Sequence, residues 1–213
     1  MGRYAFIDVQ NTESTTNQLL GFEIDWHKLY AHLKERWECE KIFFYSGIQN
    51  GDNKKIIEHQ KLSELGYIVR TKLYFIYKNP DQIIKTSCPK CKTEITHKIN
   101  KGTKWKSNCD VEFSVDAVNH MVEDAEYLFF TGDGDFEYLI RDAVENKIKV
   151  YIVSSAKKIK TGPRYFISRL SSKLRNLVAE KRKSIFFIEI NDWKMRIKKD
   201  NQTKENAVQA GVF

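Results

Sequence analysis

The chain alternates short apolar runs with segments whose apolar residues recur at helical spacing. Six runs of strand length are rich in Phe, Tyr, Ile and Val: Tyr4–Val9, Lys41–Tyr45, Tyr67–Tyr77, Tyr127–Thr131, Lys149–Val153 and Ser184–Ile190. Amphipathic helical segments lie between them, at Asp25–Trp37, Lys54–Leu65, Val111–Val122, Phe136–Asn146 and Tyr165–Ala179. This alternation predicts an α/β fold with a mostly parallel central sheet and helices on both faces.

Two stretches interrupt the alternation. Residues 79–107 are polar and contain Cys88-x₂-Cys91, so they predict an inserted loop or knuckle. Residues 200–213 show no periodicity, and we expect them to be disordered. The length of 213 residues suits one domain. We expect its main part at 1–155, with the insertion at about 79–107, and a C-terminal part of the same domain at 156–199.

Charge is distributed unevenly along the chain. Residues 1–154 contain 21 Lys and Arg against 23 Asp and Glu, a net charge of −2. Residues 155–213 contain 15 against 5, which accounts for a net charge of +10. A positional excess of this kind indicates a polyanionic partner.

The chain shows neither a signal-peptide pattern at its start nor an apolar run of 18 residues. We therefore expect a cytoplasmic protein with no membrane partner. Four cysteines in a reducing compartment do not predict a disulfide framework.

Several aspartates lie next to the predicted strands. In a parallel sheet, ligands bind at the carboxyl ends of the strands. Asp8 ends the first strand, Asp133 and Asp135 follow the fourth in Gly-Asp-Gly-Asp, and Asp110 begins a helix. Clustered carboxylates repel unless a cation neutralises them, and such oxygen ligands suit Mg²⁺ or Mn²⁺. A metal held there could assist hydrolysis of a phosphodiester.

A simpler interpretation exists for each aspartate, because Asp commonly caps helices or forms turns. Asp110 could simply cap its helix. Asp116 lies about 240° further round that helix, so it is a weaker candidate ligand.

Three motifs together resemble the NYN domain, a branch of the PIN-like nucleases that includes LabA-like bacterial proteins. They are Phe6-Ile-Asp-Val-Gln-Asn11, Lys106-Ser-Asn-Cys-Asp-Val-Glu-Phe-Ser-Val-Asp-Ala117 and Thr131-Gly-Asp-Gly-Asp-Phe-Glu-Tyr-Leu-Ile140. They occur in the family's order and span about residues 4–155. Val9-Gln10 stands where a Gly commonly follows the first Asp, and Ser107-Asn108-Cys109 replaces a Gly-Val-like stretch.

The resemblance implies a Rossmann-like PIN fold whose acidic pocket binds Mg²⁺ or Mn²⁺. By matching positions, it implies metal-ligand roles for Asp8, Asp110, Asp133 and Asp135, with Asn11 orienting a water or a phosphate. Lys106 matches a Lys that often opens the second motif and would contact phosphate. The catalytic part would then be residues 1–155.

Other candidate phosphate ligands are cations of the C-terminal third: Lys157, Lys158, Lys160 and Arg164. The cysteines raise a separate hypothesis. Cys88 and Cys91 predict half of a structural zinc site, with His97 and Cys109 as possible further ligands. The alternative is a reduced, exposed pair of thiols.

These observations predict a Mg²⁺- or Mn²⁺-dependent endoribonuclease acting on single-stranded or structured RNA, with DNA as a possible substrate. The alternative is a catalytically silent RNA-binding or regulatory module of the same fold. A small-molecule phosphoryl-transfer enzyme is disfavoured, because Asp8-Val-Gln10 lacks the second acid of an Asp-x-Asp motif. Homodimerisation is compatible with the sequence, although no heptad seam specifies it.

Overall fold

The structure is a computed structural model that describes residues 2–106, 109–160 and 166–200. Six parallel strands form the central sheet, in the order β12-β9-β8-β1-β2-β3. Their bounds are β1 Arg3–Asp8, β2 Lys41–Ile48, β3 Ile68–Leu73, β8 Glu126–Phe130, β9 Lys149–Ser154 and β12 Ile185–Glu189. After β1, the chain adds β2 and β3 on one side of it, and then β8, β9 and β12 on the other side. The strand order therefore reverses between β1 and β8, where doubly wound sheets bind ligands.

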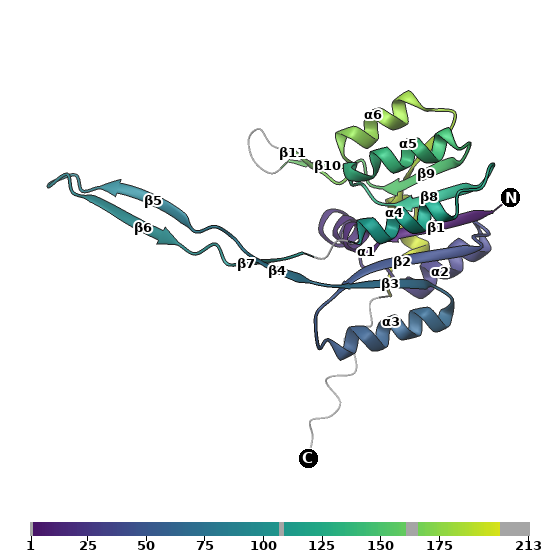
Figure 1. Cartoon of the computed structure of the whole chain (residues 1–213), viewed down its shortest axis with the longest axis horizontal. Coiled ribbons are helices and arrows are strands. Elements are labelled where there is room, and N and C mark those ends of the chain that lie inside the picture. Colours follow the sequence, from purple (N-terminus) through teal and green to yellow (C-terminus); the bar gives the residue numbers. More distant parts are fainter. Residues whose placement is uncertain (1, 107–108, 161–165, 201–213) are drawn as a thin grey trace, which may run out of the picture.

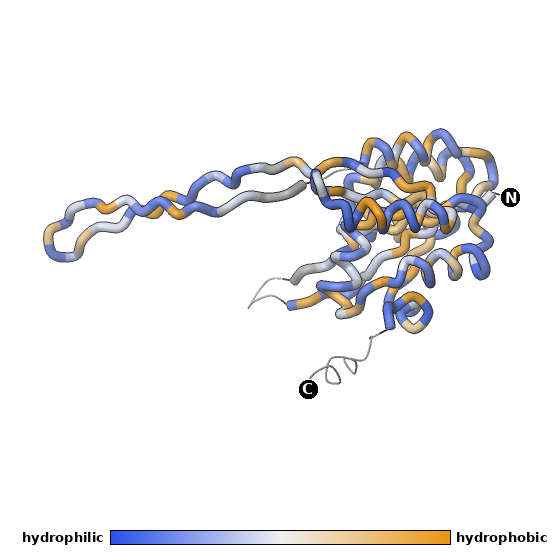
Figure 2. Tube along the Cα trace, turned by 90° about the horizontal axis from the view of Figure 1, so that it is seen from below, coloured by the Kyte–Doolittle hydropathy of each residue, from blue (hydrophilic) through white to orange (hydrophobic). Residues whose placement is uncertain are grey.

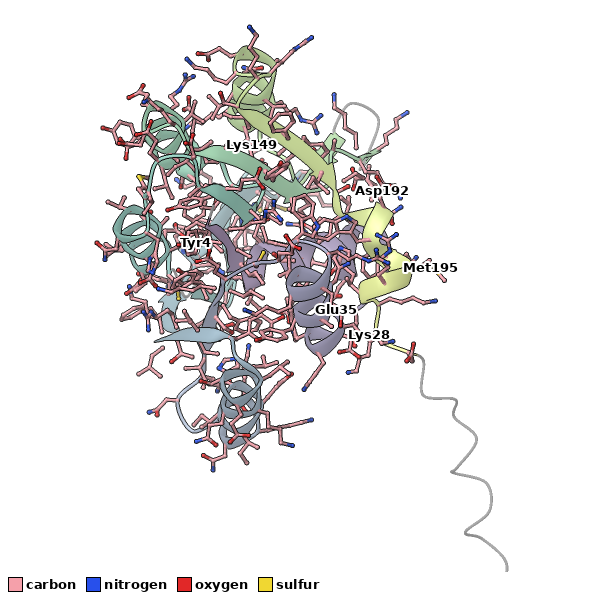
Figure 3. All side chains as sticks on the ribbon, turned by 90° about the vertical axis from the view of Figure 1, so that its right-hand side faces the viewer. Tyr4, Lys28, Glu35, Lys149, Asp192 and Met195 are labelled. Carbon is pink, nitrogen blue, oxygen red and sulfur yellow. The ribbon has the colours of Figure 1, made fainter. Side chains whose placement is uncertain are left out.

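Helices cover both faces of this sheet (Figure 1). One layer contains α2 (Trp26–Glu35), α3 (Asn53–Leu65) and α7 (Lys194–Ile197), and the other contains α4 (Asp110–Asn119), α5 (Glu137–Glu145) and α6 (Ser172–Glu180). Figure 3 shows the first layer on the side of Lys28 and Met195. The predicted α/β fold with a parallel sheet between two helical layers is confirmed.

The alternation of side chains along β1 explains why both layers are needed. Ala5 and Ile7 are buried in the core beneath α2 and α7, whereas Phe6 is buried in the core beneath α4 and α5. Phe6 stacks on Phe43 of β2 with a distance of 4.9 Å between ring centroids. A strand that is apolar on both faces cannot lie at a solvated surface, so β1 lies in the middle of the sheet.

A short helical segment after β1 was not predicted. It consists of α1 (Val9–Glu13) and a π-helix over Ser14–Leu20. Its polar, threonine-rich sequence has low helix propensity. A tertiary contact compensates: the single proton of the Thr12 hydroxyl is within reach of the Phe130 carbonyl at 3.1 Å as well as the local Asp8 carbonyl at 2.6 Å.

The insertion forms a long antiparallel arm that projects away from the sheet (Figures 1 and 2). Its base pairs β4 (Phe75–Lys78) with β7 (Thr103–Lys106), and its outer part pairs β5 (Gln82–Ser87) with β6 (Glu94–Ile99). Every residue of β5 and β6 is exposed. The predicted strand Tyr67–Tyr77 is therefore two strands, because the chain leaves the sheet after Leu73 and continues into the arm.

The C-terminal third completes the sheet with β12 and its cover with α6. The predicted helix over Tyr165–Ala179 is wrong in its first part: β11 (Phe166–Ser168) pairs with β10 (Lys158–Lys160), and the helix begins at Ser172 with Ser171 as its cap. Asp200 forms an ion pair with Lys28 at 2.8 Å, and residues 201–213 lie outside the described residues. None of the helices that the structure describes is long and apolar enough to cross a membrane.

Candidate active site

A polar pocket opens at the carboxyl ends of β1 and β8, where the strand order reverses. It brings together residues from five separate parts of the chain: Asp8, Gln10, Asn11, Ser14, Tyr45, Gly47, Cys109, Asp110, Phe113, Asp133, Asp135, Phe136 and Arg169. All four aspartates of the predicted metal site, and Asn11, line this one pocket.

Asp8 ends β1 and is partly buried. One of its oxygens accepts the Asn11 backbone N–H at 3.1 Å and thereby caps α1, and the other accepts the Thr131 hydroxyl at 3.5 Å. Burial is the main cause that raises the pKa of Asp8 to about 6, and the nearby charges of Asp110 and Asp133 contribute to the same shift. The polypeptide thus holds a carboxylate where its negative charge is disfavoured, a condition typical of functional sites.

The Gly-Asp-Gly-Asp loop after β8 positions Asp133 and Asp135. The Asp133 carboxylate accepts the Asp135 backbone N–H at 3.0 Å, and the Thr131 hydroxyl accepts the Asp133 N–H at 3.2 Å. The two glycines of this loop, Gly132 and Gly134, pack closely against residues 169–171. A Cβ on Gly132 would lie 2.1 Å from the Arg169 carbonyl oxygen, and a Cβ on Gly134 would lie 2.9 Å from the Ser171 hydroxyl.

Asn11 links the first acidic segment to this loop. Its side-chain oxygen accepts the Gly132 backbone N–H at 2.9 Å. Because this oxygen holds the loop, we assign the predicted role of orienting a water or a phosphate to the NH₂ group of the same side chain. Asn11 is thus at least a positioning residue for Asp133 and Asp135.

The two aspartates of α4 differ in their surroundings. Asp110 begins the helix and lines the pocket. Asp116 lies six residues further along on another face of the helix. Its carboxylate binds Arg70 through Nε at 3.0 Å and Nη2 at 3.2 Å and accepts the Tyr45 hydroxyl at 3.1 Å. Asp116 therefore ties α4 to β2 and β3 and does not line the pocket.

Arg169 brings a positive charge to the pocket, a role that the sequence pattern did not assign to it. Its Nη2 donates to the Gln18 side chain at 2.5 Å, while its Nε is buried without a hydrogen-bond partner among the described residues. A buried N–H group without an acceptor is costly.

The proposed phosphate ligands lie around the same edge or outside the described residues. Lys157, Lys158 and Lys160 are exposed in and just before β10, which follows the carboxyl end of β9. Lys106 ends β7 at the base of the arm, but its side chain is not described, and Arg164 lies outside the described residues.

The chemistry of the pocket fits a hard divalent cation. Four aspartates line one pocket, and repulsion from Asp110 and Asp133 contributes to the raised pKa of Asp8. A bound cation would offset this repulsion. Over the described ranges, however, no three His, Cys, Asp or Glu side chains converge tightly enough to hold a metal without other ligands. The carboxylates are therefore compatible with a divalent cation only where water or substrate supplies further ligands.

The four proposed zinc ligands do not come together in one chain. Cys88 and Cys91 lie at the tip of the arm, between β5 and β6, whereas Cys109 lies in the body and donates from Sγ to the Ser46 carbonyl at 3.9 Å. Cys39 is buried in the core beneath α2.

Comparisons with known proteins agree with this arrangement. The chain is 25% identical over 154 residues to the low amplitude and bright protein LabA of Synechococcus elongatus, a match that covers 70% of this chain and 72% of the relative. Its fold resembles the crystal structure of a protein of unknown function, VPA0982, from Vibrio parahaemolyticus, with a TM-score of 0.54 and 19% identity. That likeness covers 88% of this chain and 93% of the other. The model of the NYN domain matches residues 4–171, so the chain belongs to the NYN domain family, in the LabA-like branch of the PIN-like nuclease superfamily.

Proposed function

We propose that the protein is a Mg²⁺- or Mn²⁺-dependent nuclease that hydrolyses phosphodiester bonds in RNA. The observation that carries this proposal is the buried Asp8 carboxylate, which faces the charges of Asp110 and Asp133 at the point where the strand order reverses. A pocket that concentrates like charges is unfavourable by itself. It becomes favourable when a divalent cation and a phosphate enter together.

Each pocket residue has a distinct part in this proposal. Asp8, Asp110, Asp133 and Asp135 would hold the cation, directly or through water. When bound, the cation would act as a Lewis acid toward a phosphoryl oxygen and lower the pKa of a water. Asn11 keeps the Gly132 loop in place, so that the acids from β1 and β8 face the same space. The guanidinium of Arg169 would contact the scissile phosphate or its neighbour.

The surroundings of the pocket suit a flexible single strand. The arm leaves the sheet at the carboxyl edge on which the pocket opens, and its described lysines are exposed: Lys78, Lys85, Lys90, Lys92, Lys98 and Lys101. Only Asp81 and Glu94 oppose them within β4 to β7. Phe75 and Tyr77 of β4 are more than half exposed and could stack on unpaired bases. We therefore propose single-stranded RNA as the preferred substrate.

The test is cleavage of labelled single- and double-stranded RNA and DNA by the purified chain with Mg²⁺, Mn²⁺ or EDTA. We expect cleavage of single-stranded RNA that EDTA abolishes and that Asp8→Asn or Asp133→Asn lowers by at least about 100-fold. Asp124→Asn is the matched control, because Asp124 lies in the turn before β8, at the opposite edge of the sheet. An Asp133→Asn protein that cleaves as fast as the wild type would remove the basis of the proposal.

The alternative is an RNA-binding module without catalytic activity. One observation favours it: among the described residues, no three His, Cys, Asp or Glu side chains form a group that could hold a metal ion. Such a module would bind RNA with strong salt dependence but leave it intact with either cation. RNA binding without cleavage would therefore favour this function over the nuclease.

A further inference from the structure

The tip of the arm is a turn that presents two thiols to solvent. Cys88 is partly exposed and Cys91 is exposed. The Cys88 backbone N–H donates to the Thr93 carbonyl, and the Lys92 N–H donates to the Cys88 carbonyl, each at 2.9 Å. Lys92 adopts a left-handed backbone with φ of 62°, a conformation that is costly for a residue with a side chain. The turn thus fixes both cysteines on one small loop at the end of a long arm.

The arm itself supplies no further ligands for a metal at this tip. His97 lies four residues beyond Thr93 along β6, which places it roughly 13 Å away at about 3.3 Å per residue. Cys109 and Cys39 are in the body. Within the described part of the chain, no third His, Cys, Asp or Glu completes a metal-binding group. A zinc ion needs four ligands in a tetrahedron, so the tip is half a site.

We propose that the arm tips of two copies of this chain share one zinc ion, held by Cys88 and Cys91 of each copy. The proposal is independent of the nuclease activity. A two-fold axis through the zinc makes the two halves equivalent, as in most homodimers. Because the arm projects from the body, the two tips can meet while the two sheets stay apart (Figures 1 and 2).

The charges at the tip favour this assembly only when the metal is present. Zinc with four thiolates carries a formal charge of −2 and releases four protons when it forms from thiols. Lys90 and Lys92 flank the cysteines on each copy and are exposed. They would offset the negative charge of the zinc centre, whereas without zinc they would repel one another.

The apolar face of the arm provides an independent reason for a second copy. The register of β5 and β6 places Ile84, Ile95 and Ile99 on one face, with 36%, 46% and 45% of their surface exposed. A two-stranded ribbon in water is only marginally stable. Joining two tips places a second identical face next to the first, so both could be partly covered.

The experiment is a zinc titration of the full chain, reduced and freed of metal, followed by light scattering and metal analysis. We expect a doubling of the molecular mass at one zinc per two chains, reversal by EDTA, and the charge-transfer absorption of a tetrathiolate site with Co²⁺. The double variant Cys88→Ser/Cys91→Ser should stay monomeric, while His97→Ala and Cys109→Ser should dimerise as the wild type does. Circular dichroism checks that each variant is folded.

Three outcomes would overturn the proposal. The first is one zinc per chain in a monomer, which would assign the missing ligands to the same chain. The second is loss of zinc binding in His97→Ala or Cys109→Ser. The third is a mass that does not respond to zinc.

Discussion

The side-chain oxygen of Asn11 accepts a hydrogen bond from the backbone N–H of Gly132, across a separation of 121 residues in the sequence. This bond joins the segment after β1 to the loop after β8. Asp8 lies on one side of it, and Asp133 and Asp135 lie on the other. The two acidic segments of the pocket are therefore held together by an amide group that carries no charge.

Replacing Asn11 with Ala should loosen this connection. We expect a loss of about 1–2 kcal/mol in the free energy of unfolding, because the Gly132 N–H loses its acceptor. RNA cleavage, where present, should fall further than the stability loss explains, because Asp133 and Asp135 would no longer be fixed relative to Asp8. Urea unfolding and cleavage assays measure the two effects. Asn119→Ala, at an exposed position that ends α4, is the control, and equal effects of both variants would contradict a positioning role.

Gly132 should tolerate no side chain. A Cβ there would lie 2.1 Å from the Arg169 carbonyl oxygen and 2.7 Å from the Ser154 hydroxyl. We expect Gly132→Ala to lower the free energy of unfolding by about 3 kcal/mol or more, because backbone must move to make room. Gly51→Ala is the control for backbone strain without a steric clash, because Gly51 has φ of 81° and open space around the position that a Cβ would take. That variant should lose only about 1–2 kcal/mol, and a similar loss in both would show that packing around Gly132 is loose.

The parts of the fold that follow from apolar periodicity could be predicted from the sequence. Five strands of the sheet are apolar runs, whereas the edge strand β3 contains Arg70, Thr71 and Lys72. The shared edge of Asp8 and Asp133 follows because parallel strands have their carboxyl ends on the same side of the sheet. The arm could not be predicted in the same way. Its strands have no buried face, so no alternation of apolar and polar residues marks them.

Individual side chains of the site were less predictable where long-range contacts decide their role. Asp116 belongs to the same motif as Asp110, but Arg70 of β3 draws its carboxylate away from the pocket. Arg169 belongs to a stretch with many cations, and only the packing of its backbone against Gly132 brings it beside the acids. The helical offset of about 240° makes Asp116 the weaker candidate ligand from the sequence alone, but nothing local in the sequence predicts its contact with Arg70 or the position of Arg169.

Arg169 should contribute to the binding of phosphate groups. Arg169 lines the acidic pocket, and its Nε lacks a hydrogen-bond partner among the described residues. We expect Arg169→Gln to weaken RNA binding by about tenfold in the presence of Ca²⁺, a cation chosen to support binding without cleavage. Filter binding at several salt concentrations should show a smaller salt dependence than in the wild type. Arg141→Gln is the control, because Arg141 pairs with Glu137 and Glu180 on the helical layer. A variant that binds as the wild type does would exclude a phosphate contact.

Cys91 should react with alkylating reagents well before Cys39. Hydrogen bonds from Thr93, and then from Cys88, lower the pKa of the Cys91 thiol to about 7, whereas burial raises the pKa of Cys39 to about 12. The thiolate is the reactive form. In metal-free protein we therefore expect the alkylation rate of Cys91 to rise through about pH 7 and level off above about pH 8. Cys39 should stay unmodified until the chain unfolds.

Peptide mass spectrometry after timed alkylation distinguishes the two sites. Thr93→Val should shift the pH profile of Cys91 upward, because the hydroxyl that stabilises the thiolate is lost. A Cys91 profile centred near pH 9 in the wild type would contradict the role of Thr93.

Asp8 should make the folded protein less stable as the pH rises. Its pKa in the folded state is about 6, above the ordinary value of 3.8, so the folded state binds the proton more tightly than the unfolded state. The free energy of unfolding should therefore fall between about pH 4 and pH 6, and the full penalty should persist at higher pH. Asp8→Asn keeps an acceptor for the Asn11 N–H without the charge. We expect it to be more stable than the wild type by about 1–3 kcal/mol at pH 7 and equally stable near pH 4.

Urea unfolding from pH 4 to pH 8 without divalent cations measures this difference, with Asp124→Asn as the control that should show none. A difference between Asp8→Asn and the wild type that does not change with pH would mean that Asp8 is not the titrating group. A variant that gains stability while it loses RNA cleavage would show that the buried charge is retained for function, because a purely structural cap would lose stability when its charge is removed.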